Sequence, residues 1–379
     1  MTPVRLALVM NKVEVGGAEV LLLNLFRAFD PAVVAPRLVL LKEPGALGPE
    51  FAAAGFPVEV LGKGGRFDVR TVPRLLRSFR RHRDDVVLVT HLHAAAVTFG
   101  RLAAWVSGRR SILAPHGMDN LTFAGRRLLA RHDVATLFWS DALVIVGERQ
   151  GRYLRDLEGV GRRPWSRIRE TVVQNGIPLP PAPTQAARAE ARAALGLHPD
   201  DLAVGIVARL THVKGHEFLL EAMAKLAPAH PRMRLICIGD GEREAELRAL
   251  ASASGIADRV HFAGLRRDVA RLLPGFDVAC LTSRYECAPI AVIEAMAAGV
   301  PVVVSDVGTV RDMVTDGVEG LIFPAGDVSA LAAHLDRLAD DATLRSRLGC
   351  AGRARAENDF RIEHTAERYQ QLLLELAGR

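Results

Sequence analysis

Short apolar segments alternate with helical stretches along this chain, and the alternation restricts its fold more than any other feature. Each apolar segment is long enough for one strand, and each is followed by a helical pattern that can cover it. Alternation at this spacing is typical of parallel sheets with helices on both faces. In the first half the apolar segments are RLALVM (5–10), PRLVLL (36–41), VEVL (58–61), DVVLVTH (85–91), SILAPH (111–116), ALVIVG (142–147) and TVVQNG (171–176).

A proline-rich segment divides the chain into two similar halves. Pro178, Pro180, Pro181 and Pro183 cannot be accommodated in a helix or a central strand, which is typical of a linker. The second half repeats the pattern with DLAVGIVAR (201–209), RLICIGD (234–240), VHFAG (260–264), DVACLT (277–282), PVVVSD (301–306) and GLIFPAG (320–326). We predict domains at 1–178 and 191–360, a linker at 179–190 and a C-terminal helix at 361–379. Two such domains imply a cleft, and ligands of open α/β sheets bind beyond the carboxyl ends of the strands.

The composition is globular, and the first half is basic. Of the 379 residues, 49% are apolar and 24% are charged, which suits a chain of two ordinary domains. Residues 1–180 carry 26 Lys and Arg against 16 Asp and Glu, a net of +10, and the remainder carries 23 against 27, a net of −4. Nucleic acid, an anionic lipid surface and a phosphate-bearing acceptor are all compatible with this charge.

Several classes of protein are disfavoured by what the sequence lacks. No apolar run has the length of a membrane-spanning helix, and VRLALVM near the start is too short for a secretion signal, so we expect a cytoplasmic protein. No Asp-x-Asp triplet or paired histidine spacing is present, so we expect no metal. The cysteines lack C-x-x-C spacing and are predicted to be buried free thiols: Cys237, Cys280, Cys287 and Cys350.

The segment RYECAPIAVIEAMAAGVPVV (284–303) carries the strongest functional signal. Pro289 suits the first position of a helix, which leaves the amides of Ile290 and Ala291 free. Free amides at the start of a helix bind anions. Glu286 then lies in the loop before the helix and Glu294 lies one turn inside it, so the two carboxylates can contact two parts of one elongated, phosphate-bearing ligand.

Two cations follow an apolar segment earlier in the second half. Arg209 and Lys214 lie in the loop after AVGIVA, at the sheet edge where Glu286 is also expected. A diphosphate fits two such cations, and cations already in place stabilise the charge that develops on a leaving group. The alternative interpretation is that both side chains are simply solvated.

Taken together, these segments resemble the GT4 family of retaining, nucleotide-sugar-dependent glycosyltransferases. Glu286 and Glu294 match its E-x7-E signature, and Gly16 and Gly17 match its first glycine loop. Further segments follow in the family's order: HLHAA (91–95), PHGMDN (115–120), QNGI (174–177), VARLTHVKGHEFLLEAM (207–223), IGDGEREAEL (238–247) and FAGLRRDVARLL (262–273). The resemblance implies the α/β GT-B fold, in which two Rossmann-like, doubly wound domains face a cleft. The first domain then binds the acceptor and the second the nucleotide sugar.

The resemblance also implies roles for single residues. Glu294 would accept hydrogen bonds from the ribose hydroxyls, Glu286 would lie near the donor sugar, and Arg209 and Lys214 would bind the diphosphate. His116 matches a histidine near the anomeric centre, with His93 or His91 as a less secure second. The remaining donor-binding positions are Gly16, Gly17, Gly239, Pro289, Ile290 and Ala291, and Asp240 is interpreted as a turn residue.

One position departs from the family pattern. The family commonly has glycine after the first glutamate, whereas this chain has Cys287 followed by Ala288. A side chain there crowds the approach of the backbone to the sugar, so the resemblance does not transfer the identity of the donor sugar.

The segment TVPRLLRSFRRHRDD (71–85) predicts a basic amphipathic helix. Its apolar stripe is Val72, Leu75, Leu76 and Phe79, and its cations are Arg74, Arg77, Arg80, Arg81 and Arg83. Such a helix can lie on anionic lipid at the inner membrane face. The alternative is that the stripe faces the domain core and the arginines are solvated.

We therefore predict a metal-independent, retaining glycosyltransferase that needs no cofactor. It would move a hexose or N-acetylhexosamine from a UDP-sugar to a hydroxyl of a lipid-linked or cell-surface glycan precursor, as in polysaccharide biosynthesis. The alternatives are glycosylation of a soluble small molecule, a nucleotide-sugar epimerase or phosphorylase of the same fold, and a non-catalytic sugar- or nucleic-acid-binding protein. Only 5% of the residues are aromatic and none interleave with basic residues, which disfavours nucleic acid.

Overall fold

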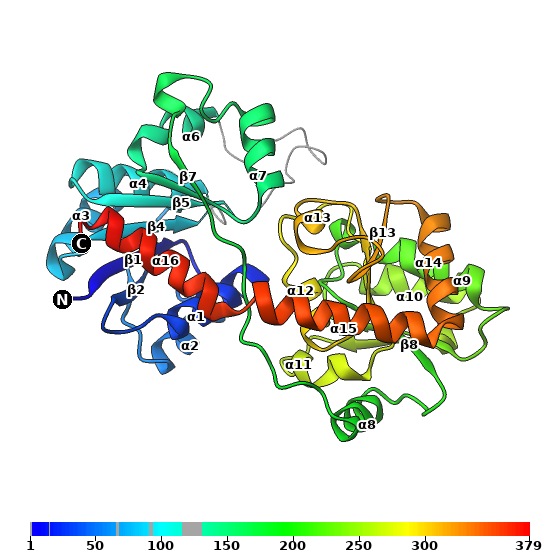
Figure 1. Cartoon of the computed structure of the whole chain (residues 1–379). Helices are drawn as coiled ribbons and strands as arrows, with labels where there is room; N and C mark the ends of the chain where they lie inside the picture. Colours follow the sequence, from blue (N-terminus) through cyan, green and yellow to red (C-terminus); the bar gives the residue numbers. More distant parts are fainter. Residues whose placement is uncertain (1, 15, 66–67, 91–93, 116–130) are drawn as a thin grey trace. The chain divides into compact units, whose positions relative to one another are not determined.

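The structure is a computed structural model, and it describes residues 2–14, 16–65, 68–90, 94–115 and 131–379. Its contacts divide the chain into two compact units. Unit 1 contains Met1–Pro178 and Ile362–Arg379, and unit 2 contains Leu179–Arg361. Figure 1 shows a parallel sheet with flanking helices in each unit. The prediction of two doubly wound α/β units is confirmed.

Unit 1 is built on a seven-stranded parallel sheet with the order β3-β2-β1-β4-β5-β6-β7. Its strands are β1 (Val4–Met10), β2 (Val34–Leu40), β3 (Val58–Val60), β4 (Val86–Thr90), β5 (Arg110–Ala114), β6 (Ala142–Ile145) and β7 (Arg169–Val172). Its helices and short turns are α1 (Gly17–Ala28), α2 (Gly48–Ala53), α3 (Thr71–His82), α4 (Ala94–Val106), α6 (Arg131–Ala135), η1 (Leu137–Trp139), α7 (Glu148–Tyr153), η2 (Leu154–Glu158), η3 (Pro164–Ser166) and α16 (Ile362–Leu376).

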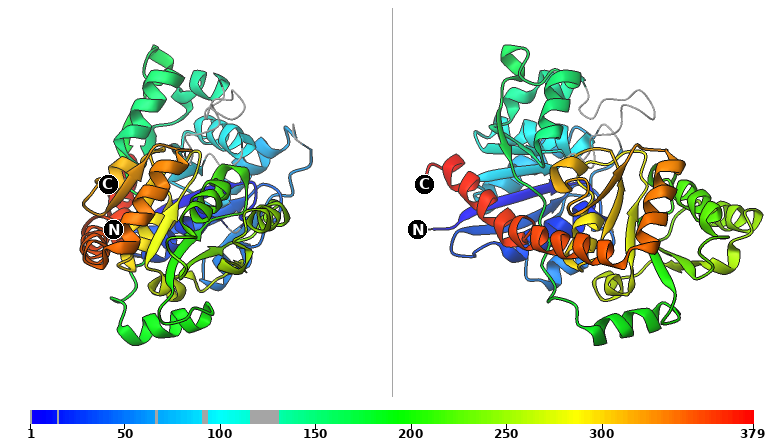
Figure 2. Two further views of the ribbon diagram at one scale, coloured as in Figure 1. Left: turned by 90° about the vertical axis from the view of Figure 1, so that its right-hand side faces the viewer. Right: turned by 45° about the vertical axis from the view of Figure 1, so that its right-hand side comes forward.

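The helices of unit 1 cover both faces of the sheet, because its central strands are apolar on both sides. One face packs against α3 and α4, whose Leu75, Phe79 and Val97 are fully buried in the core. The last helix, α16, packs against α1, and Figure 2 shows this red helix beside the blue N-terminal segments. The end of the chain is therefore part of unit 1.

Unit 2 is built on a six-stranded parallel sheet with the order β10-β9-β8-β11-β12-β13. Its strands are β8 (Leu202–Val207), β9 (Met233–Ile238), β10 (Val260–Gly264), β11 (Val278–Leu281), β12 (Val302–Ser305) and β13 (Gly320–Phe323). Its helices and turns are α8 (Gln185–Ala194), η4 (His212–Lys214), α9 (His216–Leu226), α10 (Glu244–Ala253), η5 (Ala257–Arg259), α11 (Val269–Leu272), η6 (Leu273–Gly275), α12 (Ile290–Ala297), α13 (Val310–Met313), α14 (Val328–Asp340) and α15 (Ala342–Asp359).

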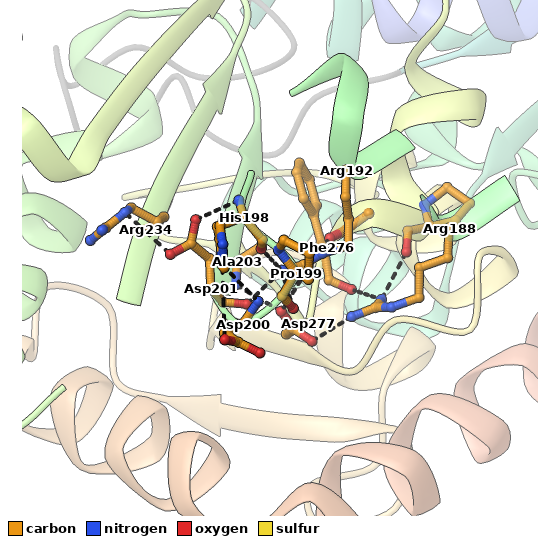
Figure 3. Close-up of polar contacts among 12 residues, drawn as sticks. Arg188, Arg192, His198, Pro199, Asp200, Asp201, Ala203, Arg234, Phe276 and Asp277 are labelled. Carbon is orange, nitrogen blue, oxygen red and sulfur yellow. Dashed lines mark hydrogen bonds and ion pairs between the residues drawn. The ribbon is translucent and has the colours of Figure 1, made fainter. Parts of the chain in front are cut away.

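A network of charged groups fixes α8 to the amino ends of β8 and β11. Asp277 accepts hydrogen bonds from Arg188 at 2.6 Å, from Arg192 at 3.1 Å and from the amide of Ala203 at 2.7 Å. Figure 3 shows both arginines of α8 pointing toward Asp277. Their remaining donors bond carbonyl oxygens of Pro274, Gly275, Phe276, His198, Pro199 and Asp201. Helix α8 thus begins inside the segment that was predicted to be a linker.

One sequence-based prediction is wrong, and one choice between two interpretations is decided. Cys350 is exposed on α15, whereas the other three cysteines are buried as predicted. The apolar stripe of α3 faces the core of unit 1, where Leu75 and Phe79 have no exposed surface, so this stripe is not available to a membrane. The alternation of apolar and basic residues in α3 reflects a core-facing helix with a solvated side.

Candidate functional site

The predicted donor-binding residues of unit 2 gather where its strand order reverses. The sheet runs outward from β8 in one direction and from β11 in the other, so the connections after these two strands diverge. Such a point leaves a crevice beyond the carboxyl ends of the strands, which is the usual ligand site of open α/β sheets. The loop after β8 carries Arg209 and Lys214, and the loop after β11 carries Glu286.

An ion pair joins the two loops. Lys214 ends the turn η4, and its ammonium lies 2.5 Å from a carboxylate oxygen of Glu286. The hydroxyl of Ser283 donates to the same oxygen at 2.7 Å, and the hydroxyl of Thr282 donates to the carbonyl of Lys214 at 3.1 Å. An ammonium has three donors, so its contact with Glu286 leaves donors for a ligand. The pair holds the cation at a defined place before any ligand binds.

The loop that carries Glu286 is fixed from beneath by the connection after β12. The amide and the hydroxyl of Thr309 donate to the carbonyl of Cys287 at 2.8 Å and 2.7 Å. Gly308 has a φ of +54°, and a Cβ there would lie 2.2 Å from the carbonyl oxygen of Glu286. Ser305 donates a further hydrogen bond to the backbone of this loop at 2.7 Å. Glycine is required here because the two backbones touch.

Helix α12 begins directly after this loop, and its first turn has open donors. Pro289 is the N-cap, with a φ of −70° and a ψ of 110°, so the helix begins at Ile290, one residue later than predicted. The amide of Val292 donates to the carbonyl of Pro289 at 3.2 Å. No acceptor among the described residues bonds the amides of Ile290 and Ala291. Two open amides at the positive end of the helix dipole favour an anion.

Glu294 lies one turn inside α12 with a carboxyl group that has no partner among the residues that the structure describes. Its side chain is half-buried. Burial raises the pKa of Glu294 to about 7, because the charged form is poorly solvated there. Hydrogen-bond donors brought by a ligand would stabilise the carboxylate. The group is therefore suited to accept hydrogen bonds from hydroxyls.

Arg209 and Gly239 complete the edge on the other side of β8. The guanidinium of Arg209 is exposed and pairs with no carboxylate within the described part of the chain. Gly239 has a φ of +139°, and a Cβ there would lie 2.1 Å from the carbonyl oxygen of Ala208. Its amide donates to the carbonyl of Gly264 at 2.8 Å, so it joins the loops after β8, β9 and β10. Asp240 is exposed, and its carbonyl accepts from the amide of Leu210, as a turn residue does.

Comparisons with known proteins agree with this arrangement. A family model described as Glycosyltransferase Family 4 matches residues 15–179, and one described as Glycosyl transferases group 1 matches residues 187–355. The putative glycosyltransferase EpsF of Bacillus subtilis (strain 168) is 30% identical over 305 residues, which are 79% of this chain and 78% of EpsF. The chain belongs to glycosyltransferase family 4.

Other similar proteins extend the family likeness without fixing a substrate. The lipopolysaccharide core biosynthesis mannosyltransferase LpsB of Rhizobium meliloti (strain 1021) is 32% identical over 206 residues. That match covers 52% of this glycosyltransferase and 59% of LpsB. The crystal structure of Anabaena HepE has a TM-score of 0.85 at 20% identity and covers 98% of this chain and 100% of HepE. The shared fold is GT-B, with two Rossmann-like units.

The predicted residues of unit 1 are described in part. Gly16 is the N-cap of α1, Gly17 is its first residue, and the carbonyl of Gly16 accepts from the amide of Val20 at 3.0 Å. They follow β1, which with β4 forms the point where the strand order reverses in this glycosyltransferase's first sheet. His116, and also His91 and His93, lie outside the described residues.

Several supporting residues of this glycosyltransferase were not predicted. Glu217 accepts from Arg243 at 2.7 Å and from Arg284 at 2.6 Å, and Arg284 lies over the ring of Phe218. Burial acts to raise the pKa of Glu217, but hydrogen bonds from its own amide and from the two arginines outweigh burial and lower it. Ser283, Ser305 and Thr309 were also missed. Ser283 and Ser305 could have been identified from the sequence, because each is a polar residue at the end of an apolar segment.

One other polar cluster and one groove lie apart from these loops. His230 contacts Asp336 at 2.7 Å through Nε2 and Asp340 at 4.0 Å through Nδ1. A mainly apolar groove of about 480 Å³ is lined by the proline-rich segment, α8 and α11, and includes none of the predicted site residues. No helix in the described ranges is long and apolar enough to cross a bilayer.

Proposed function

We propose that this glycosyltransferase moves a hexose or N-acetylhexosamine from a UDP-sugar to an acceptor hydroxyl, with retention of configuration. The observation that carries the proposal is the ion pair of Lys214 and Glu286, which joins the loops after β8 and β11 where the strand order reverses. Arg209 lies in the first of these loops, and α12, with its open amides and Glu294, follows the second. These groups match the parts of a nucleotide sugar: a diphosphate, a ribose and a sugar. Crystal structures of HepE in complex with UDP and with UDP-glucose support a UDP-linked donor.

Each side chain has a task in the proposed reaction. The bond between the anomeric carbon and the diphosphate oxygen breaks, and a bond from the acceptor oxygen forms on the same face of the sugar. The acceptor's hydroxyl proton passes to the departing diphosphate oxygen. Lys214 and Arg209 stabilise the charge on that oxygen, as preorganised cations do in many active sites. Glu286 orients Lys214 and the donor sugar, and Glu294 accepts from the ribose.

The resemblance to the family adds three residues of unit 1 to the proposal. The start of α1 at Gly16 and Gly17 presents backbone amides suited to the donor's phosphate. His116 is proposed to act near the anomeric carbon. A His116→Ala variant is expected to bind UDP normally and to lose turnover, measured by isothermal titration and by a product assay. Weakened UDP binding with unchanged turnover would contradict this role.

The proposed reaction needs no divalent ion, because the two cations and the amides of α12 neutralise the diphosphate. Turnover is therefore expected to continue in excess EDTA after exhaustive dialysis. Loss of turnover that returns with added Mg²⁺ or Mn²⁺ would show that the cations of the site are insufficient.

Two measurements test the function itself. A thermal-shift screen of nucleotide sugars should raise the melting temperature with one UDP-sugar, because a ligand bound by the native state stabilises it. NMR of the product should show the donor's anomeric configuration. Conversion of the donor without an acceptor would indicate an epimerase, use of phosphate as the acceptor a phosphorylase, and binding without turnover a sugar-binding protein.

The acceptor is proposed to be a lipid-linked or cell-surface glycan precursor at the cytoplasmic membrane face. The names of LpsB and of the lipopolysaccharide outer core galactosyltransferase WaaB support this class. On α3, Arg77, Arg80, Arg81 and Arg83 are exposed and available to anionic lipid. Faster transfer to a soluble small molecule than to a lipid-linked sugar would reject this acceptor class.

Cys287 is proposed to influence the choice of donor sugar. Its side chain is buried and its carbonyl is held by Thr309, so a glycine there would open space next to Glu286. A Cys287→Gly variant is expected to accept a wider set of UDP-sugars, measured as kcat/KM across the panel. An unchanged ranking of donors would exclude this position as a selector.

A further inference from the structure

Unit 1 exposes a cluster of aromatic side chains. Trp105, at the end of α4, is 52% exposed and Phe138, in η1, is 49% exposed. Their rings meet edge to face at 6.0 Å, and the ring of Trp139 lies 6.3 Å from that of Trp105. Trp165 is 44% exposed on η3, which packs against η1. Large rings gathered in this way and left open to water mark an interaction surface.

The topology places this cluster at the amino ends of the strands. Helix α4 ends before β5, η1 lies before β6, and η3 lies before β7. The glycine loop of unit 1 follows β1 and therefore lies at the opposite edge of the sheet. A partner bound to the aromatic cluster leaves that carboxyl-end edge open. The chain has three tryptophans, and all of them lie in this cluster.

The scaffold holds the aromatic rings outward. Beneath them, Arg101 and Asp133 form a fully buried ion pair at 2.8 Å, and the guanidinium lies 5.9 Å from the ring of Trp139. The hydroxyl of Ser111 donates to the carbonyl of Trp139 at 2.8 Å. The space beneath the ring of Trp139 is thus occupied by a buried ion pair.

Exposed arginines flank the cluster on both sides. Arg80 and Arg83 end α3, and Arg109 ties that end to the turn after α4 by donating to the carbonyl of Phe79 at 3.0 Å. On the other side, Arg162, Arg163 and Arg167 surround Trp165. Arg80, Arg83, Arg162, Arg163 and Arg167 form no salt bridge with any described residue. By contrast, three carboxylates of the same edge, Asp84, Asp85 and Asp141, are paired with Arg37, Arg5 and Arg110. Asp156, whose carbonyl accepts a hydrogen bond from Arg162, is exposed.

We propose that this surface docks on an anionic lipid bilayer. Tryptophan is favoured at the boundary between headgroups and acyl chains, where its apolar ring is buried and its N–H finds a partner. Arginines around the rings that form no salt bridge match the negative charge of lipid headgroups, and the guanidinium of Arg163 lies 5.4 Å from the ring of Trp165. The surface supplies the apolar contact that α3 does not, because the stripe of α3 is buried. The proposal does not depend on which sugar is transferred.

The tryptophans themselves report the test. The full chain is mixed with vesicles of equimolar phosphatidylglycerol and phosphatidylcholine, or with vesicles of phosphatidylcholine alone. We expect co-sedimentation with the anionic vesicles, a blue shift of the intrinsic fluorescence, and quenching by brominated acyl chains. Binding should weaken in high salt, which screens the arginines.

Two variants separate the contribution of the aromatic rings to vesicle binding from that of the arginines. Phe138→Ser keeps all three tryptophans and should weaken binding by roughly tenfold, and Arg162→Ser with Arg163→Ser should weaken it by roughly tenfold or more. The matched controls on unit 2 are Val318→Ser, at an exposed apolar residue, and Arg271→Ser with Arg337→Ser, at exposed cations.

The outcomes decide the proposal. Binding by the parent that both cluster variants weaken and both controls retain supports it, provided that UDP still raises the melting temperature of every variant. Absence of binding to anionic vesicles, or binding without a change in fluorescence, overturns it. Concentration-dependent self-association that Phe138→Ser abolishes, without vesicle binding, assigns the surface to a second copy of the chain and also overturns it.

Discussion

The two edges of the unit 2 sheet differ in how completely their charged side chains are paired. At the amino ends, the carboxylate of Asp277 is bonded by Arg188, Arg192 and a backbone amide, and both arginines bond carbonyl oxygens as well. At the carboxyl ends, Arg209 and Glu294 have no partner in the described structure. The network at the amino ends is satisfied within the fold. At the carboxyl ends some groups are paired, as Lys214 is with Glu286, but Arg209 and Glu294 remain open to a ligand.

This difference distinguishes residues that contribute to folding stability from residues that bind the ligand or act in catalysis. Removing one member of a buried, fully hydrogen-bonded charge network destabilises the folded protein, because the remaining members are left buried without a partner. A poorly solvated carboxylate such as that of Glu294 costs free energy in the free protein, and a ligand that brings hydrogen-bond donors recovers that cost on binding. Substitutions at the two edges should therefore affect different measurements.

The largest effect is expected at the functional edge. Lys214→Ala should lower kcat by about 10²- to 10³-fold, because it removes a cation aimed at the leaving diphosphate. The loss of stability should be smaller than the loss of turnover, because Glu286 keeps the hydrogen bond from Ser283 when Lys214 is removed. Lys225→Ala, at an exposed lysine on α9, is the matched control and should leave kcat unchanged. Near-normal turnover of Lys214→Ala would discredit the assignment.

A large loss of stability is expected at the opposite edge. Asp277→Ala should lower the free energy of unfolding by about 3 kcal/mol, since it leaves the guanidinium of Arg192, whose side chain is only 10% exposed, without its carboxylate. Arg188 adds little to this loss, because its side chain is 39% exposed and water can replace the carboxylate. Denaturant unfolding measures this change. Asp200→Ala removes an exposed aspartate that pairs with Arg232 in the same region, and it should cost less than about 1 kcal/mol. If Asp277→Ala and Asp200→Ala lowered the free energy of unfolding equally, the network around Asp277 would have no special part in stability.

His216 should make the stability of unit 2 depend on pH. The residue is fully buried at the start of α9, its ring nitrogens have no partner in the described residues, and burial lowers its pKa to about 4. The unfolded chain takes up the proton first as pH falls below about 6.5, so stability falls between there and about pH 4 by roughly 3 kcal/mol. His216→Leu should abolish that part of the pH dependence, and a parallel loss in both proteins would rule out His216 as its source.

The smallest effect concerns the ribose. Because the pKa of Glu294 is raised to about 7, its carboxylate forms as pH rises through neutrality, and hydroxyl donors prefer that form. UDP should therefore bind about tenfold more tightly at pH 8 than at pH 6. Glu294→Gln should bind more weakly at pH 8 and show a flatter profile by isothermal titration. The same slope in both proteins would place the titrating group elsewhere.

Much of the fold could be predicted because its information is local. A strand covered on both faces must be apolar along its length, so each of the predicted apolar segments overlaps a strand. The overlap is poorest for TVVQNG (171–176), which includes only the last two residues of the edge strand β7. Polar residues that follow such strands collect at one edge, so Lys214 and Glu286 could be placed together before their contact was known. The start of α12 differed by one residue, because proline is compatible with the N-cap as well as with the first helical position.

Only the tertiary structure shows the contacts between residues that lie far apart in the chain. The sequence did not show that the stripe of α3 faces the core, that burial raises the pKa of Glu294, or that Trp105, Phe138 and Trp165 share one edge. Each of these depends on strand order and on which helix covers which face. Strand order and the placement of helices depend on how the whole unit buries its apolar surface, so no short segment of the sequence determines them.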